Sequence, residues 1–162
     1  MHYRLYQSAD FPQLYAIELL CFQPPFRFSR RYMQQLIANP NSATWIAESR
    51  IAEAKPAEQE REMTAFAIVE WSTEDAQTTA YIQTLEVAPA HRKRGIATEL
   101  LSLLETSAST AGASAIALHV AESNTAAIHL YQSHGYQPHG REENYYATGI
   151  HALIYKKFEL TE

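Results

Sequence analysis

The chain has 162 residues, 46% of them apolar, which is enough to bury the core of one globular domain. Its formal net charge of −5 argues against a nucleic-acid partner, because such proteins usually carry an excess of Lys and Arg. The single cysteine, Cys21, excludes an internal disulfide, and no Cys/His spacing predicts a metal site. The N-terminus has no basic segment followed by a long apolar run, and no stretch would span a bilayer. We therefore expect a cytoplasmic protein without a membrane partner.

The order of the expected elements defines the fold class. They are a strand over 2–6, helices over 8–21 and 29–38, strands over 44–48, 63–71 and 81–87, a helix over 98–110, a strand over 115–120, a helix over 125–133, and strands from 136 and over 151–160. This order, β-α-α-β-β-β-α-β-α-β-β, predicts an α/β fold with a mixed sheet and helices on both faces. No linker or repeat divides the chain, so residues 1–162 are expected to form a single domain.

Two segments between these elements differ from the rest in composition. The loop over 22–28 carries Pro24 and Pro25, which forbid a regular helix, and three phenylalanines, which are costly to leave in water. Its rings either fold onto the core or present an apolar surface to a substrate, and the sequence leaves both possibilities open. The segment 49–62 is charged and poor in large apolar residues, which predicts an exposed, mobile excursion between two hairpin strands.

A strand, a basic turn and a helix start follow one another between Tyr81 and Ala97. Side chains alternate from Tyr81 to Val87, and Pro89 should end this strand because it cannot donate a backbone hydrogen bond. Gly95 precedes the next helix, whose free N–H groups and positive dipole end favour an anion. The turn therefore predicts a phosphate or pyrophosphate site, with a solvated basic turn at the start of a surface helix as the alternative.

Two stretches of the chain resemble motifs of the GCN5-related N-acetyltransferase (GNAT) superfamily. Arg92–Ala97 reads Arg-x-x-Gly-x-Ala and resembles the pyrophosphate loop, Gln/Arg-x-x-Gly-x-Gly/Ala. Residues 118–136 resemble the second half of the family, where a strand ends at Ser-Asn and a helix carries Ala-Ile-x-Leu-Tyr before Gly-Tyr/Phe. The resemblance covers roughly Tyr81–Tyr146 and is closest to the RimI-type and other N-terminal α-amine acetyltransferases, as the triplet Asn144–Tyr146, expected between the last two strands, also indicates. It implies the GNAT fold, with a mostly antiparallel sheet of about seven strands.

The resemblance implies acetyl-CoA as the cosubstrate and no metal. Backbone groups of Leu85, Glu86 and Val87 would bind its pantetheine arm, and Asn124 would contact the same arm. The pyrophosphate would bind the backbone of the turn formed by Arg92, Lys93, Arg94, Gly95, Ile96 and Ala97.

The resemblance also implies two proton-transfer roles. Tyr131 matches the tyrosine near the thioester sulfur, whose phenol can protonate the leaving thiolate. The RimI-type enzyme has a glutamate where this chain has His119, and a eukaryotic relative pairs that histidine with a tyrosine that matches Tyr81. His119 and Tyr81 are therefore candidates for activating the amine through water, whereas the alternative keeps both as structural residues of the sheet.

The energetics of proton removal favours an N-terminal α-amine as the acceptor. Deprotonation at pH 7 costs about 1 kcal/mol for an α-amine, whose pKa is about 7.8, and about 4.6 kcal/mol for lysine, whose pKa is about 10.4. The residues expected to frame the acceptor are Phe26, Phe28, Tyr145 and Tyr146, and they suit a peptide N-terminus with an apolar first side chain.

The sequence thus predicts an acyltransferase that moves acetyl from acetyl-CoA to the N-terminal amine of a protein or peptide, with a ribosomal protein among the candidate acceptors. Direct attack in a ternary complex is expected, because Cys21 lies far in sequence from both motifs. Two alternatives stay open: the same chemistry on a small-molecule amine or a lysine side chain, and a CoA-binding module without catalysis.

Overall fold

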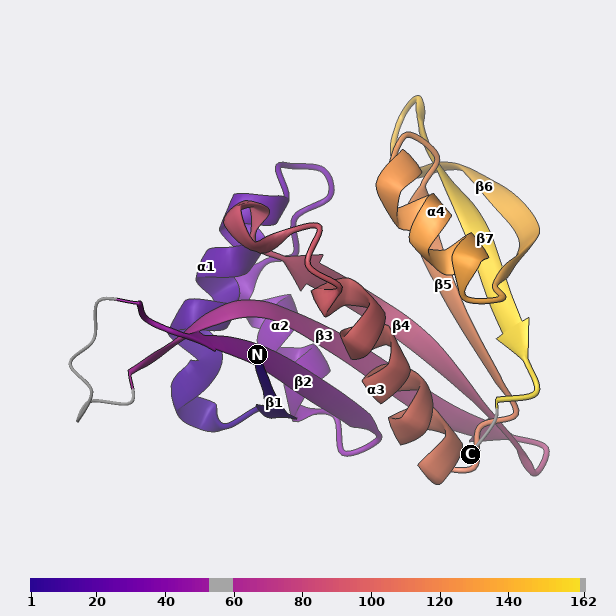
Figure 1. Ribbon diagram of the computed structural model, residues 1–162. Coiled ribbons are helices and arrows are strands. Elements are labelled where there is room, and N and C mark those ends of the chain that lie inside the picture. The colour runs from indigo at the N-terminus through magenta and orange to yellow at the C-terminus, as the bar shows by residue number, and fades with distance from the viewer. Residues whose placement is uncertain (53–59, 161–162) are drawn as a thin grey trace.

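The computed structural model of the protein describes residues 1–52 and 60–160 (Figure 1). Within these ranges, seven strands form one sheet in the order β1-β2-β3-β4-β5-β7-β6. The strands are β1 (His2–Leu5), β2 (Ser42–Arg50), β3 (Arg61–Glu74), β4 (Gln77–Val87), β5 (Ala115–Ala121), β6 (Gln137–Ala147) and β7 (Ile150–Phe158). The helices are α1 (Phe11–Cys21), α2 (Arg30–Ala38), α3 (Ile96–Thr110) and α4 (Thr125–Ser133), with short 3-10 turns η1 (Ser8–Asp10) and η2 (Pro89–His91).

The sheet is mixed but mostly antiparallel. Neighbouring strands run antiparallel except β4 and β5, which are parallel and are connected through α3. A parallel pair needs such a crossover, because a tight turn can join only antiparallel strands. The predicted order of elements, the predicted sheet and the helices on both of its faces are confirmed.

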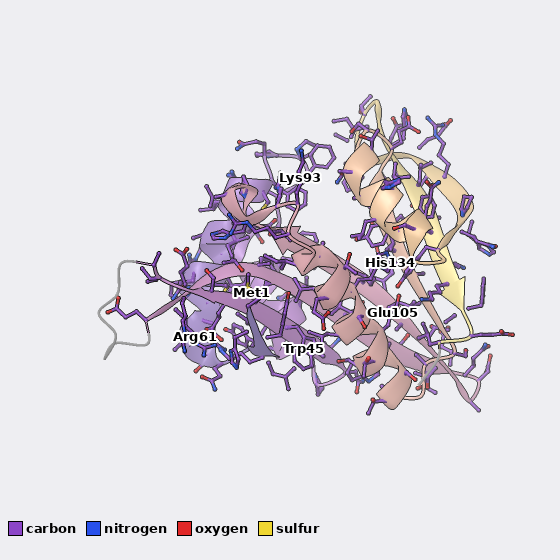
Figure 2. The ribbon with its side chains drawn as sticks, in the orientation of Figure 1. Met1, Trp45, Arg61, Lys93, Glu105 and His134 are labelled. Atoms are coloured by element: carbon purple, nitrogen blue, oxygen red, sulfur yellow. The ribbon has the colours of Figure 1, made fainter. Side chains whose placement is uncertain are left out.

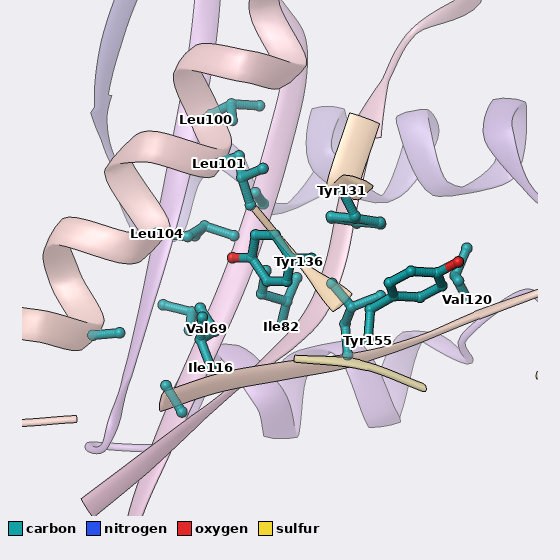
Figure 3. Packing of buried hydrophobic residues seen from close by; sticks show 14 of the residues in the cluster. Val69, Ile82, Leu100, Leu101, Leu104, Ile116, Val120, Tyr131, Tyr136 and Tyr155 are labelled. Atoms are coloured by element: carbon teal, nitrogen blue, oxygen red, sulfur yellow. The ribbon is translucent and has the colours of Figure 1, made fainter. Parts of the chain in front are cut away.

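The two faces of the sheet bury separate hydrophobic cores. On one face, α3 places Leu100 and Leu104 one turn apart against strand residues such as Ile82 (Figure 3). On the other, α1 and α2 cover a cluster that includes Leu14 and Phe66, both completely buried. Each fully buried side chain of this size stabilises the fold by about 1.5–3 kcal/mol, so these clusters hold the helices on the sheet.

Local signals in the sequence set the helix starts. Ser29 Oγ accepts a hydrogen bond from the Tyr32 N–H (3.1 Å), which confirms the expected cap of α2. Asn124 Oδ1 likewise accepts one from the Ala127 N–H (3.2 Å) at the start of α4. Before α1, Ser8–Asp10 form a 3-10 turn instead of a first helical turn, so α1 begins later than expected.

Several elements extend further than the alternation of residues predicts. β2 continues to Arg50 and β3 begins at Arg61, because their polar ends pair across the hairpin. The excursion expected over 49–62 is therefore partly strand, and residues 53–59 of it lie outside the described residues. The triplet 144–146, expected between the last two strands, lies within β6 itself.

Candidate active site

The sheet splits between β4 and β5 and leaves a wedge-shaped gap (Figure 1). The two strands are paired at Ala80–Ile116 and Tyr81–Ala117, and beyond these pairs β4 follows β3 while β5 follows β7. A bulge in β4 at Gln83 lies just where the strands begin to diverge. Backbone groups on the open edge of β4 are therefore available to a ligand.

The ladder between β3 and β4 decides which of these backbone groups face the gap. The Ala88 N–H donates to the Thr64 carbonyl, so the hydrogen-bonded pairs of this antiparallel ladder include Glu86. The intervening residues Leu85 and Val87 turn their backbone groups to the other side, toward the gap. Of the three residues expected to offer backbone contacts, Leu85 and Val87 have this orientation and Glu86 bonds β3 instead. The Val87 carbonyl already accepts from Arg92, so Val87 offers its N–H.

Two adjoining cavities open from the gap. The first, about 600 Å³ and here called the basic groove, is lined among others by Leu85, Glu86, Val87, Arg92, Lys93, Gly95, Ile96, Ala97, Asn124 and Tyr131. The second, about 470 Å³ and here called the aromatic pocket, is lined among others by Phe26, Phe28, Tyr81, His119, Tyr131, Tyr145 and Tyr146. Both share Phe22, Leu85, Asn124, Ala127 and Tyr131, so they form one continuous cleft. Arg94 is the one expected site residue that lines neither cavity.

The turn before α3 shapes the basic groove. Lys93 and Gly95 have positive φ angles of 64° and 80°, a conformation in which successive backbone N–H groups can gather around an anion. Figure 2 shows Lys93 at this end of α3, where its side chain is exposed. The Arg92 guanidinium instead donates to the Val87 carbonyl (2.9 Å) and contacts Cys21 Sγ (3.6 Å). It fixes the end of β4, which leaves the backbone of the turn to bind an anion.

His119 is held by three side chains in the aromatic pocket. Its Nδ1 lies 2.7 Å from the Tyr81 hydroxyl and its Nε2 2.8 Å from Glu142 Oε1. The Tyr145 ring stacks on the imidazole, with centroids 4.3 Å apart and 4° between the planes. Burial raises the pKa of Tyr81 far above its ordinary value, so its hydroxyl remains protonated at neutral pH. Sequence reasoning missed Glu142, because β6 carries no large apolar side chain from Gln137 to Asn144 and so shows no alternation that would mark Glu142 as the residue facing His119.

Tyr131 lies where the two cavities meet. It is 7% exposed, and burial raises the pKa of its phenol above the ordinary value, so it holds a proton that it can donate. Asn124 lines both cavities as well and uses its side-chain oxygen to cap α4. Its amide N–H₂ group remains to donate to a ligand.

Aromatic rings from distant parts of the sequence form the wall of the aromatic pocket. Phe26 packs edge-on against Tyr146 of β6, with centroids 4.9 Å apart. Phe28 packs against Tyr32 (5.2 Å) and also against the core under α1 and α2. The loop over 22–28 therefore both lines the pocket and contributes to the core. Tyr32 also lines this pocket, and the sequence gave no signal for it, because it lies on helix α2, outside both motifs.

An arch in β6 carries the two tyrosines over the cleft. Residues 143–146 stand opposite the single residue His151, so four residues of β6 match one of β7. Asn144, with a φ of 56°, donates its N–H to His151 Nδ1 (2.9 Å) and accepts the Gly149 N–H on its side-chain oxygen (2.7 Å). These two hydrogen bonds hold the arch in place, so Asn144 has a structural role beside the two tyrosines that follow it.

Two acidic side chains meet in a buried position beside the basic groove. Glu18 of α1 and Glu86 of β4 are 0% and 2% exposed. Glu18 Oε1 accepts the Phe28 N–H (2.7 Å), and Glu86 Oε1 accepts the Thr84 hydroxyl (2.7 Å). Their second oxygens lack a donor among the described side chains unless one carboxyl carries a proton. Burial, together with the neighbouring Glu18 carboxyl, raises the pKa of Glu86 well above its ordinary value, which favours a proton on Glu86 that can bridge the two carboxyl groups.

Comparison with known proteins decides the family. Residues 11–136, well over half of the chain, match the sequence model described as "Acetyltransferase (GNAT) family". The protein is a GNAT acetyltransferase. This GNAT chain is 26% identical over 150 residues to "N-terminal acetyltransferase A complex catalytic subunit NAA10" of Arabidopsis thaliana, a match that covers 91% of this chain and 72% of that protein. The expected family and the expected class, an acetyl-CoA-dependent N-acetyltransferase, are confirmed.

Solved structures share the GNAT fold. The ribosomal-protein-S18-alanine N-acetyltransferase from Escherichia coli superposes with a TM-score of 0.78 at 23% identity, covering 99% of this chain and 94% of that one. Arabidopsis thaliana NAA60 in complex with acetyl-CoA gives a TM-score of 0.80 at 22% identity, covering 97% of each chain. The expected GNAT fold is therefore confirmed.

Within residues 1–52 and 60–160, no three His, Cys, Asp or Glu side chains gather where they could hold a metal ion. Within the same ranges, no helix of this GNAT protein is long and apolar enough to cross a membrane.

Proposed function

We propose that this enzyme transfers acetyl from acetyl-CoA to the N-terminal α-amine of a protein or peptide in the cytoplasm. The observation that carries the proposal is the hydrogen-bonded Tyr81–His119 pair inside a pocket walled by aromatic rings, next to the basic groove. The names of the similar NAA10 and S18-alanine enzymes, which specify N-terminal or alanine acetylation, support the same acceptor class. A ribosomal protein is one candidate acceptor.

The basic groove fits the two chemical halves of the donor. The turn Arg92–Ala97 offers backbone N–H groups and a helix N-terminus to the pyrophosphate. Leu85, Val87 and Asn124 offer backbone and side-chain amides to the pantetheine arm, which itself carries amides. Acetyl-CoA would supply an acetyl group activated as a thioester. The basic groove and the aromatic pocket join at Tyr131, so the thioester and the acceptor amine can meet at this residue.

Tyr81 and His119 act together to take the proton from the amine. When the Tyr81 hydroxyl donates to His119 Nδ1, 2.7 Å away, the lone pairs of its oxygen can accept a proton from the substrate. As the amine attacks, its proton passes to the Tyr81 oxygen while the Tyr81 proton passes to His119. No phenolate forms on this route, which suits a tyrosine whose pKa is raised by burial. Unlike a route through water, it uses a contact already present between the two side chains.

Tyr131 supplies the opposite proton transfer. The thiolate that leaves when the C–S bond breaks takes its proton from the Tyr131 phenol at the junction of the cavities. The Tyr131 oxygen then regains a proton from solvent, which balances the proton that His119 releases. The attack is direct, so no side chain of the protein carries the acetyl group.

The wall of the aromatic pocket determines the acceptor preference. An apolar first side chain that packs among Phe26, Phe28 and Tyr146 would be stabilised by about 1.5–3 kcal/mol, or about tenfold to a hundredfold in affinity. The Tyr81–His119 pair favours an α-amine over a lysine side chain as the acceptor, because removing the proton of an α-amine costs less free energy.

A peptide library incubated with enzyme and acetyl-CoA, read by mass spectrometry, tests the proposal. Peptides with a free N-terminus and an apolar first residue should gain one acetyl group. A matched peptide with a blocked N-terminus and an internal lysine should gain none. Acetylation of that lysine, or of small-molecule amines alone, would overturn the acceptor class. Calorimetric binding of acetyl-CoA without turnover on any amine would identify a CoA-binding module instead.

A further inference from the structure

We propose that Glu142 is a positioning residue of the reaction: it holds His119 with a proton on Nε2, so that Nδ1 is the atom that receives the proton relayed by Tyr81. The inference rests on the proposed function, because it assigns a task to a group behind the Tyr81–His119 pair. Glu142 touches neither the acceptor nor the donor in this scheme and acts through the imidazole.

The hydrogen-bond chemistry of the three side chains fixes the imidazole tautomer. A carboxylate can only accept, so Glu142 Oε1, at 2.8 Å, requires the proton to be on His119 Nε2. The neutral imidazole then has its lone pair on Nδ1, which accepts from the Tyr81 hydroxyl at 2.7 Å. Because burial keeps the Tyr81 phenol protonated, the hydroxyl can donate in this direction. Each atom of the chain Glu142–His119–Tyr81 thus has one consistent role.

Glu142 is free to serve the imidazole because its neighbours satisfy the nearby cation. Arg141 donates to Glu122 through Nε (2.9 Å) and Nη2 (3.2 Å), and to Glu143 through Nη1 (3.0 Å). The adjacent Glu143 therefore engages Arg141, while Glu142 engages His119. Neighbouring residues on a strand point to opposite faces, which explains why these two glutamates have different partners.

The stacked Tyr145 completes the support of the imidazole. Two hydrogen bonds to its ring nitrogens and one parallel ring leave the imidazole little freedom to rotate. The remaining titratable groups that line the pocket around it are Tyr146 of β6, Tyr131 of α4, Tyr32 of α2 and Glu70 of β3. None of the described side chains lining the aromatic pocket is a lysine or arginine, so the imidazolium formed by proton transfer faces the Glu142 carboxylate without a competing cation.

The proton balance follows from this arrangement. The amine N–H bond breaks as its proton binds the Tyr81 oxygen, and the Tyr81 O–H bond breaks as that proton binds His119 Nδ1. The imidazolium keeps its Nε2 proton, shared with Glu142, and returns one proton to solvent after the reaction. In this scheme Glu142 accepts the Nε2–H hydrogen bond and takes no proton itself, because its role is to stabilise the positive charge of the imidazolium.

Kinetics of Glu142→Gln test the proposal, with Glu143→Gln as the matched control. Glu142→Gln keeps the size of the side chain but removes its charge, so kcat should fall about 10- to 100-fold, as for carboxylates that orient metal-binding histidines. The KM for acetyl-CoA should stay near that of the wild type. The pH profile of kcat should also change, because the variant removes the negative charge that faces the imidazolium formed during the reaction. Glu143→Gln should leave all three quantities unchanged. A Glu142→Gln enzyme with the kcat and pH profile of the control would overturn the proposal.

Nitrogen NMR of the wild-type protein without substrates gives a second readout. The His119 resonances, assigned by their loss in His119→Ala, should show a proton on Nε2 and a bare Nδ1 at a pH where the ring is neutral. A proton on Nδ1 would overturn the proposal even if Glu142→Gln were slow. This measurement needs no acceptor, so it stands independently of the peptide assay: a failed peptide assay with the Nε2–H tautomer present rejects the proposed function alone.

Discussion

Replacing Glu86 by glutamine perturbs the proton that two buried carboxyl groups share. Glutamine has the shape of a protonated glutamate, and its N–H₂ group can donate to the Glu18 oxygen that otherwise depends on the shared proton. The variant therefore keeps its hydrogen bond at every pH, whereas the wild type keeps it only while the pair is protonated.

The magnitude of the effect follows from proton linkage. The raised pKa of Glu86 means that the folded protein holds a proton that the unfolded chain has already released above about pH 4.3. This stabilising contribution is complete below that pH and is lost as pH rises toward the folded pKa. Over this interval the free energy of unfolding of the wild type should fall by about 1.4 kcal/mol per pH unit relative to Glu86→Gln. For a chain of this size, that is about 3–6 °C in Tm per pH unit.

Thermal unfolding followed by circular dichroism, from about pH 5 to about pH 8, measures the difference. The Tm of Glu86→Gln minus that of the wild type should grow as pH rises. Glu74→Gln, at the exposed end of β3, is the matched control and should run parallel to the wild type. Parallel curves for Glu86→Gln and the wild type would refute the shared proton.

Three further predictions concern the cleft. Gly95→Val should weaken acetyl-CoA binding strongly in calorimetry, because the φ angle of Gly95 is 80° and a side chain at this position would project into the open basic groove. Lys93→Ala should weaken binding only slightly, because an exposed charge is screened by salt. Equal losses of affinity in the two variants would contradict the role given to the backbone of the turn. Tyr131→Phe should lower kcat by about a hundredfold or more while acetyl-CoA affinity stays nearly constant, and near-native turnover would remove Tyr131 as the acid. Cys21→Ala should have the kcat of the wild type, because burial raises the pKa of the Cys21 thiol to about 11 and the proposed attack on the thioester is direct. Acetylated Cys21 detected by mass spectrometry during turnover of the wild type would contradict this mechanism.

The parts of the fold that depend on local chemistry could be predicted from the sequence. The caps at Ser29 and Asn124 need only a side chain and a backbone N–H three residues away, so the sequence around them contains both partners. The strand that ends at Val87 could be predicted for the same reason, since Pro89 is a local stop. The Tyr81–His119 contact was anticipated from the family resemblance, because the two residues are 38 positions apart.

The parts that depend on register could not be predicted. Glu142 reaches His119 because β6 departs from regular pairing on both sides of it, after Pro138 and again at the arch over 143–146. Shifting a strand by one residue would turn the other glutamate inward, and a polar strand offers no apolar face to fix that choice. The Glu18–Glu86 pair joins a helix to a strand across 68 positions, and glutamate inside a core contradicts the usual distribution of charge.

The arch in β6 also has a consequence for self-association. β6 is an outermost strand of the sheet, and its backbone could in principle template the strand of a second molecule. Pro138, the charged run Arg141–Glu143 and the four-residue arch interrupt that ladder along its length. The irregularity that brings Tyr145 and Tyr146 over the pocket thus also blocks edge-to-edge aggregation. Trimming the arch to regular hairpin geometry would therefore remove the pocket wall and, in the same step, one of the three interruptions that protect this edge.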